Sequence, residues 1–177
     1  MVWKKKDRTI SLSSSLTISF LLGDNQYMPS PAPFLDVEIR TFPDLRVIHR
    51  LLLFRDNTGN PDRVIRPAFR ELRQQVIACG LDPDKLLHVG SPEVVEHQLV
   101  SYDCCIEFPL PVAENVRTLP GGRYAVLTVE KTPTKIRPAI RAFRGDYLPE
   151  HELVVDEVRL VYEYYFKDTL EYCVPIY

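Results

Sequence analysis

A single carboxylate stands in the middle of an aromatic, apolar run of the sequence. Glu163 lies in the segment 158–166, whose alternation predicts a β-strand. The face that carries this acid also carries Arg159, Val161 and Tyr165. Burying a carboxylate costs several kcal/mol unless something pairs with it. The acid therefore either faces solvent, pairs with Arg159, or lies in an aromatic-lined cleft, where it would suit a lipophilic cation.

The other residue types that carry chemistry form no recognised pattern. The histidines are scattered, and the four cysteines show no C-x-x-C spacing, so they are interpreted as buried free thiols of a cytoplasmic protein. Gly121-Gly122 is interpreted as a turn and Tyr102-Asp103 as a pair at a strand edge. We therefore expect no metal site and no cofactor, and we assign no catalytic residue.

An internal repeat would position the acid. Ile39-Arg40-Thr41-Phe42-Pro43 is echoed by Val116-Arg117-Thr118-Leu119-Pro120, and Ile65-Arg66-Pro67-Ala68 by Ile136-Arg137-Pro138-Ala139. A fainter echo relates the segments that begin at Cys105 and Cys173. Two copies of one supersecondary unit usually pack about a pseudo-twofold axis, and the groove between them is a natural place for a ligand.

Each copy is predicted to contain a strand, a helix and two further strands. In the first copy these elements are expected at about 46–54, 64–79, 85–90 and 99–108, with a break at Ser91-Pro92. In the second copy they are expected at about 123–130, 135–147, 157–167 and 170–176. One helix per copy on a mainly antiparallel sheet makes the chain an α+β protein with a pseudo-twofold cleft.

Composition excludes several classes of protein. Among 177 residues, 45% are apolar and 26% are charged, and the net charge of −2 creates no field that favours nucleic acid. No apolar run reaches the roughly 18 residues of a membrane span. Residues 10–22 alternate with period two, as a strand does and a signal peptide does not. We therefore expect a cytoplasmic protein with no membrane partner.

Two regions are expected along the chain. Residues 1–35 form an N-terminal strand and a Pro-rich linker, and residues 36–177 form the domain, with copies at about 36–110 and 114–177. The N-terminal strand could pair at its edge with a second copy of the chain, which would give a homodimer. Since residues 1–35 contain no two-helix DNA-binding pattern, we expect no nucleic acid to be bound directly by this chain.

Seven short motifs, in order, resemble those of the GyrI-like (gyrase-inhibitor-like) effector-binding domains. They stand here at 37–47, 68–72, 102–106, 120–126, 147–149, 162–165 and 175–176. The resemblance implies a duplicated strand–helix–strand–strand fold, as found at the C-terminus of AraC-type and some MerR-type transcription regulators and in stand-alone proteins. It further implies that Glu163 contacts ligands, often lipophilic cations, and that Tyr147 lines the same cleft.

The leading hypothesis is non-catalytic binding of a small lipophilic or cationic molecule between the repeats. The ligand-binding residues predicted from pattern and resemblance together are Glu163, Tyr147, Tyr165, Val161 and Phe143. Frequent acidic residues between 146 and 171 add weak support for a cation. The resemblance leaves two alternatives, a hydrolase of strained electrophilic small molecules that uses the cleft Glu, and a protein-binding inhibitor of a gyrase-like target. Loops that rim the cleft depart from the family pattern, so the identity of the ligand is not carried over.

Overall fold

The structure, a computed structural model, describes residues 36–54, 60–96, 98–111 and 115–177. The strand predicted at 10–22, the Pro-rich linker, and the edge pairing expected of that strand lie outside the described residues. No helix in the described part of the chain is both long enough and apolar enough to span a membrane.

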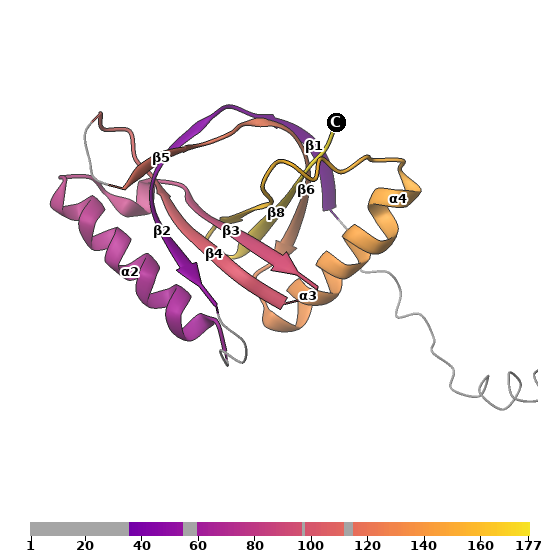
Figure 1. The fold of residues 1–177 in the computed structure, drawn as a ribbon, viewed down its shortest axis with the longest axis horizontal. Helices are drawn as coiled ribbons and strands as arrows, with labels where there is room; N and C mark the ends of the chain where they lie inside the picture. The colour runs from indigo at the N-terminus through magenta and orange to yellow at the C-terminus, as the bar shows by residue number, and fades with distance from the viewer. Residues whose placement is uncertain (1–35, 55–59, 97, 112–114) are drawn as a thin grey trace, which may run out of the picture. The chain divides into compact units, whose positions relative to one another are not determined.

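The same order of elements occurs twice (Figure 1). The first copy contains β1 (Asp36–Phe42), β2 (Leu45–Leu53), α2 (Asp62–Ala78), the short 3-10 turn η1 (Pro83–Lys85), β3 (His88–Val95) and β4 (Gln98–Glu107). The second contains β5 (Val116–Leu119), β6 (Gly122–Glu130), α3 (Pro133–Ala142), the π-turn η2 (Phe143–Tyr147), the single turn α4 (Leu148–Glu150), β7 (Tyr162–Tyr165) and β8 (Thr169–Pro175). The predicted α+β class is confirmed, with one strand more at the start of each copy.

The strands form one antiparallel sheet whose order is symmetric. The order is β1-β6-β8-β7-β3-β4-β2-β5. If each strand is replaced by its counterpart in the other copy, the same order results, counted from the opposite edge. The copies meet at the centre, where β3 pairs with β7. At the two edges, β1 of the first copy pairs with β6 of the second, and β5 of the second pairs with β2 of the first. Each copy therefore gives its first strand to the other.

The repeated arginine of the Ile-Arg-Thr and Val-Arg-Thr motifs holds this exchange together. Arg40 of β1 donates two hydrogen bonds to Glu171 of β8, at 2.9 and 2.7 Å. Arg117 of β5 lies 2.9 Å from Asp103 of β4. Each arginine thus pairs with an acid on the last strand of the other copy. Asp103 is buried in the middle of β4, which differs from the strand-edge position expected for it.

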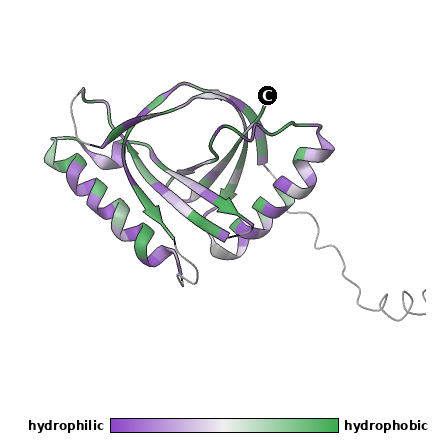
Figure 2. Ribbon diagram, viewed as in Figure 1, coloured by the Kyte–Doolittle hydropathy of each residue, from purple (hydrophilic) through white to green (hydrophobic). Residues whose placement is uncertain are grey.

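Hydrophobic and hydrophilic residues are interspersed along the strands (Figure 2), and buried apolar side chains form clusters on both faces of the sheet. On the helical face, α2 covers a cluster that includes Tyr102, Cys104 and Ile106 of β4. On the same face, α3 covers a cluster built from the inward side chains of β6 and β8. The opposite face carries a third cluster around Tyr124, Tyr162 and Tyr164. Each large side chain that is fully buried in these clusters contributes about 1.5–3 kcal/mol.

The break expected at Ser91-Pro92 does not occur, because both residues lie inside β3. Proline cannot donate to a sheet ladder, so it is tolerated where one side of a strand has no neighbour. β7 pairs with β3 at Val89 and Gly90, and Pro92 lies beyond that contact, opposite Tyr102 of β4. Pro92 therefore leaves no ladder bond unmade.

Two elements of the second copy differ from those predicted. The strand expected at 157–167 is limited to Tyr162–Tyr165, because Asp156 organises a turn before it by accepting the Val158 N–H at 3.0 Å. The helix expected at 135–147 is α-helical to Ala142, widens into the π-turn, and continues as α4 to Glu150. Pro149 is tolerated there because it lies in the first turn of α4, where its missing N–H costs little.

Candidate functional site

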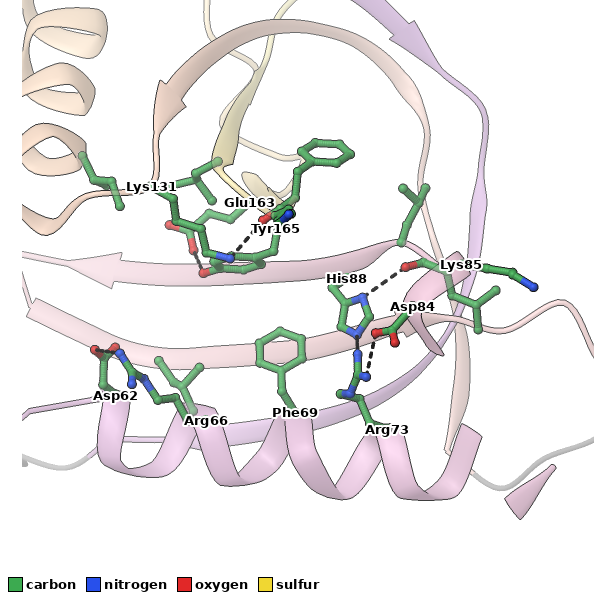
Figure 3. A pocket seen from close by; sticks show the side chains of 17 residues that line it. Asp62, Arg66, Phe69, Arg73, Asp84, Lys85, His88, Lys131, Glu163 and Tyr165 are labelled. Carbon is green, nitrogen blue, oxygen red and sulfur yellow. Dashed lines mark hydrogen bonds and ion pairs between the residues drawn. The ribbon is translucent and has the colours of Figure 1, made fainter. Parts of the chain in front are cut away.

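A groove of about 1130 Å³ lies between α2 and the central strands, where the two copies meet (Figure 3). The first copy lines it with side chains of α2, η1 and the start of β3, among them Phe69 and His88. The second copy contributes Lys131, Glu163 and Tyr165, together with apolar residues of α3 and β8. The lining therefore combines apolar side chains with charged side chains of both signs.

Glu163 is fixed in the groove by two phenols. The hydroxyl of Tyr165, on the same strand, donates to Glu163 Oε2 at 2.6 Å. The hydroxyl of Tyr102, on β4 of the first copy, donates to the same oxygen at 2.6 Å. The two hydroxyls also contact each other. A half-buried carboxylate is thus oriented by hydrogen-bond donors from both copies.

No ion pair among the described residues includes Glu163. Arg159, one of the alternatives considered for its partner, donates instead to Asp156 at 2.7 Å and to the carbonyl of Ile176 at 2.7 Å. Hydrogen bonds from neutral donors offset part of the cost of burying a charge but do not neutralise it. The carboxylate therefore keeps its negative charge available to a molecule in the groove.

Both phenols remain protonated at neutral pH. Burial raises the pKa of Tyr102 well above its ordinary value, and the neighbouring charge of Glu163 raises it further. Burial and the same charge also raise the pKa of Tyr165. Because a protonated phenol is a hydrogen-bond donor, both tyrosines can donate to the Glu163 carboxylate at neutral pH.

The position opposite Glu163 is a glycine. In the β3–β7 register Gly90 faces Glu163, and the Tyr102 ring passes over Gly90 on its way to the acid. A Cβ atom at position 90 would stand 1.9 Å from the Tyr102 hydroxyl oxygen. Glycine at this position therefore makes room for the Tyr102–Glu163 hydrogen bond.

The strand registers show which residues correspond in the two copies. Val89 faces Cys105 in the first copy as Tyr162 faces Cys173 in the second, so Gly90 is the counterpart of Glu163. The same registers make Pro92 the counterpart of Tyr165, and Leu170 the counterpart of Tyr102. The first copy therefore carries no acid at the position of Glu163. The strand arrangement therefore occurs twice, whereas the polar group of Glu163, Tyr165 and Tyr102 occurs once.

Aromatic and basic side chains flank Tyr165. The Phe69 ring on α2 meets the Tyr165 ring edge-on, with centroids 5.8 Å apart. Lys131 Nζ lies 5.4 Å from the centroid of the Tyr165 ring and donates to the carbonyl of Phe166 at 3.0 Å. Figure 3 shows Phe69 rising from α2 toward the strands, with Lys131 beside Tyr165. One ring thus contacts an acid, a base and an aromatic wall.

His88 forms the other end of the groove wall. Its Nδ1 lies 3.1 Å from the carbonyl of Leu86, which can only accept, so Nδ1 carries the proton. Nε2 is then the acceptor for Arg73 Nη1 at 3.3 Å, and Arg73 in turn pairs with Asp84 at 2.7 Å. Burial lowers the pKa of His88, which agrees with a neutral imidazole.

The structure divides the predicted ligand residues into two groups that share Tyr165. Glu163 and Tyr165 line the groove. Phe143, Tyr147 and Val161 are absent from its lining and belong, with one side of Tyr165, to the cluster beneath α3. The Tyr147 ring stacks on His151, with centroids 3.8 Å apart.

Sequence reasoning missed Tyr102, Gly90, Phe69 and Lys131. The signal for Tyr102 was present in the alternation of Tyr102, Cys104 and Ile106, which places all three on the face beneath α2. The positions of Phe69 and Lys131 depend on how the helices lie over the sheet. Within the described residues, no group of three or more His, Cys, Asp or Glu side chains is placed to hold a metal ion.

Comparison with known proteins supports the fold. A family model described as the GyrI-like small molecule binding domain matches residues 35–176. Among curated proteins, none matches the chain.

Three solved structures illustrate the likeness. The chain is similar to EcmrR in an EcmrR–DNA complex (TM-score 0.62, 11% identity, covering 98% of this chain and 68% of that one). It is similar to the EcmrR C-terminal domain, with a TM-score of 0.58 and 10% identity, over 81% of this chain and 98% of that one. It is also similar to a hydrolase from Listeria innocua, with a TM-score of 0.55 and 10% identity, over 86% of this chain and 97% of that one. At these identities the likeness establishes a shared fold.

Proposed function

The chain belongs to the GyrI-like small-molecule-binding domain family, and from this premise we propose that its groove binds a small lipophilic molecule whose cationic group meets Glu163. The role is non-catalytic. The domain acts either as the effector-binding part of a transcription-regulator-like protein, of the AraC type or another, or as a stand-alone sensor. The four free cysteines, three of them buried, suit the reducing cytoplasm that we propose as its location.

The observation that carries this proposal is the state of Glu163. Its carboxylate lies half-buried in the groove, receives two phenol hydrogen bonds on one oxygen, and takes part in no ion pair among the described residues. A ligand cation would supply the missing counter-charge where the walls exclude part of the water. The apolar side chains of Ile65, Phe69 and Ile136 in the lining favour a lipophilic body.

Glu163 and Tyr165 are the proposed contacts of the bound molecule. Phe143, Tyr147 and Val161 remain predicted contacts on the α3 side, because they pack in the cluster against which Tyr165 also packs.

Titration of a panel of lipophilic cations, including tetraphenylphosphonium and cationic dyes, tests the proposal. Glu163→Gln keeps the shape of the side chain and removes its charge, so affinity should fall by about 2 kcal/mol, the lower end of the cost of removing one partner of a desolvated charge pair. Glu157→Gln removes an exposed carboxylate that does not line the groove and serves as the matched control. Equal affinity in wild type and Glu163→Gln, or no saturable binding, would overturn the proposal.

A second candidate, hydrolysis of a strained electrophilic ring, is favoured by one observation. Both phenols donate to Oε2 of Glu163, and no hydrogen bond within the described residues involves Oε1. That oxygen could take a proton from an attacking water, while a phenol donates to the opening ring. Loss of epoxide turnover in Glu163→Gln with binding retained would support this function, and absence of turnover in wild type would contradict it.

A further inference from the structure

The groove carries charges of both signs. Its charged lining comprises the acids Asp62, Asp84 and Glu163 and the bases Arg66, Arg73, Lys85, Lys131 and Lys167. Two of the acids are already paired with arginines, Asp62 with Arg66 at 3.5 Å and Asp84 with Arg73 at 2.7 Å. Glu163 is therefore the one acid of this lining without an arginine partner, and it shares the groove with three lysines.

The acidic residues that made the C-terminal region look suited to a cation lie elsewhere. Of the acids between 146 and 171, Glu163 alone lines the groove. Asp156 is used by Arg159, and Glu171 is used by Arg40. The other acids of this region thus form ion pairs in the fold or lie outside the groove. The groove itself is lined by more basic than acidic side chains.

Lys131 lies against one of the two rings that contact Glu163. Cations are attracted to aromatic faces, and the hydroxyls of Tyr165 and Tyr102 both donate to Glu163. The ammonium of Lys131 already lies against the Tyr165 ring, with Nζ 5.4 Å from its centroid. A second positive charge on the same ring would face a like charge at close range.

The same ammonium has donors to spare. A lysine ammonium carries three N–H donors, and one of them is used by the carbonyl of Phe166 at 3.0 Å. No acidic side chain in the described part of the chain forms an ion pair with Lys131. Lys131 therefore presents a positive charge to the groove at the face of the Tyr165 ring, and Glu163 presents a negative charge at the Tyr165 hydroxyl.

From this juxtaposition we infer that the ligand is amphoteric: a lipophilic body carries a cationic group toward Glu163 and a carboxylate toward Lys131. The inference rests on the proposed function and refines the class of ligand. A molecule with both charges matches Glu163 at the Tyr165 hydroxyl and Lys131 at the face of the Tyr165 ring, whereas a purely cationic analogue brings a like charge to Lys131.

Two dyes that differ by one charge test it. Tetramethylrhodamine carries a cationic ring system and a carboxylate, and its methyl ester keeps the ring system and loses the carboxylate. Fluorescence anisotropy titrations should show wild type binding the free acid about fivefold more tightly than the ester, the upper range for an exposed charge pair. Lys131→Gln should remove this preference, and Lys131→Arg should keep most of it. Lys135→Gln removes a nearby lysine that pairs with Glu130 outside the groove, and it should leave the preference unchanged.

The outcomes distinguish failure of the amphoteric-ligand inference from failure of the proposed function. Equal binding of the two dyes, tighter binding of the ester, or a preference that survives in Lys131→Gln would overturn the inference and leave the proposed function standing. Failure of both dyes, and of the wider panel of lipophilic cations, to bind wild type would overturn the proposed function and this inference with it.

Discussion

The two copies of the repeat use the same frame and differ where they touch. In both, a helix covers the sheet, an arginine of the first strand reaches an acid on the other copy, and the last two strands form a hairpin. At the centre, however, the second copy presents Glu163 and Tyr165, and the first presents Gly90 and Pro92.

This difference has a physical reason. The residues that face each other at the centre of the sheet are counterparts, so a strictly repeated sequence would place two glutamates side by side. Like charges in a half-buried site disfavour each other. Gly90 removes the second acid and opens the space through which Tyr102 reaches the first. The site is therefore built by both copies, one supplying the acid and the other the room and a donor.

The largest expected effect compares the two arginines that hold the exchanged strands. Arg117→Met leaves the Asp103 carboxylate, 5% exposed, with His49 as its remaining partner. We expect a loss of about 3 kcal/mol in the free energy of unfolding, measured by urea denaturation, because a buried charge loses its counter-ion.

The counterpart change, Arg40→Met, should cost less, about 1–2 kcal/mol, since Glu171 is 14% exposed and regains some hydration. If Arg40→Met lowers the free energy of unfolding more than Arg117→Met does, the Arg40–Glu171 pair contributes more to stability than the Arg117–Asp103 pair, and the expected order is wrong.

Gly90→Ala tests whether the asymmetry at the centre is required. Its Cβ would collide with the Tyr102 hydroxyl, so the Tyr102–Glu163 hydrogen bond should break and stability should fall by about 2 kcal/mol. Thermal unfolding and dye binding would both report the change. Gly145→Ala is the matched control, because a Cβ there meets nothing within 4 Å. Equal melting temperatures for the two variants would show that Tyr102 moves without cost.

Tyr102→Phe and Tyr165→Phe each remove one donor from Glu163. Each should weaken ligand binding by about 1–1.5 kcal/mol, because a hydrogen bond to a charged group is stronger than one between neutral groups. Leu170→Met, at the position that corresponds to Tyr102, should leave the affinity within about 0.5 kcal/mol of wild type. Isothermal titration calorimetry measures all three, and a larger effect of Leu170→Met than of Tyr102→Phe would contradict the assigned correspondence.

The smallest effect concerns pH. Burial lowers the pKa of His88 in the folded protein below the ordinary 6.5, so the unfolded chain binds a proton first as the pH falls. Stability should therefore decline as the pH falls below about 6.5. His88 faces Arg73 and is influenced by Asp84 and Lys131, and protonation would set it against Arg73. His88→Gln should flatten the profile, and an unchanged profile would exclude His88 as its origin.

The sequence was sufficient for the frame and insufficient for the finer site. Motifs that recur in order predicted two like units, their helices and the α+β class, because periodicity and repetition are local properties. The strand exchange could not be read from them, because nothing in Ile39-Arg40-Thr41 says which copy it pairs with. Glu163 was identified because an acid is rare in an aromatic strand. Its donor Tyr102 was not, because a tyrosine in a strand is ordinary until a register places it over a glycine.

The exchange of first strands also constrains the order in which the chain can fold. β1 pairs with β6, and the rest of the first copy lies between these two strands in the sequence. β2 of the first copy pairs with β5 of the second copy. Contacts this distant in sequence form late, because a long loop must close before they are made. During synthesis the first copy therefore leaves the ribosome with an unpaired sheet edge and waits for the second. The groove, whose acid lies on the penultimate strand, is among the last parts of the domain to be assembled.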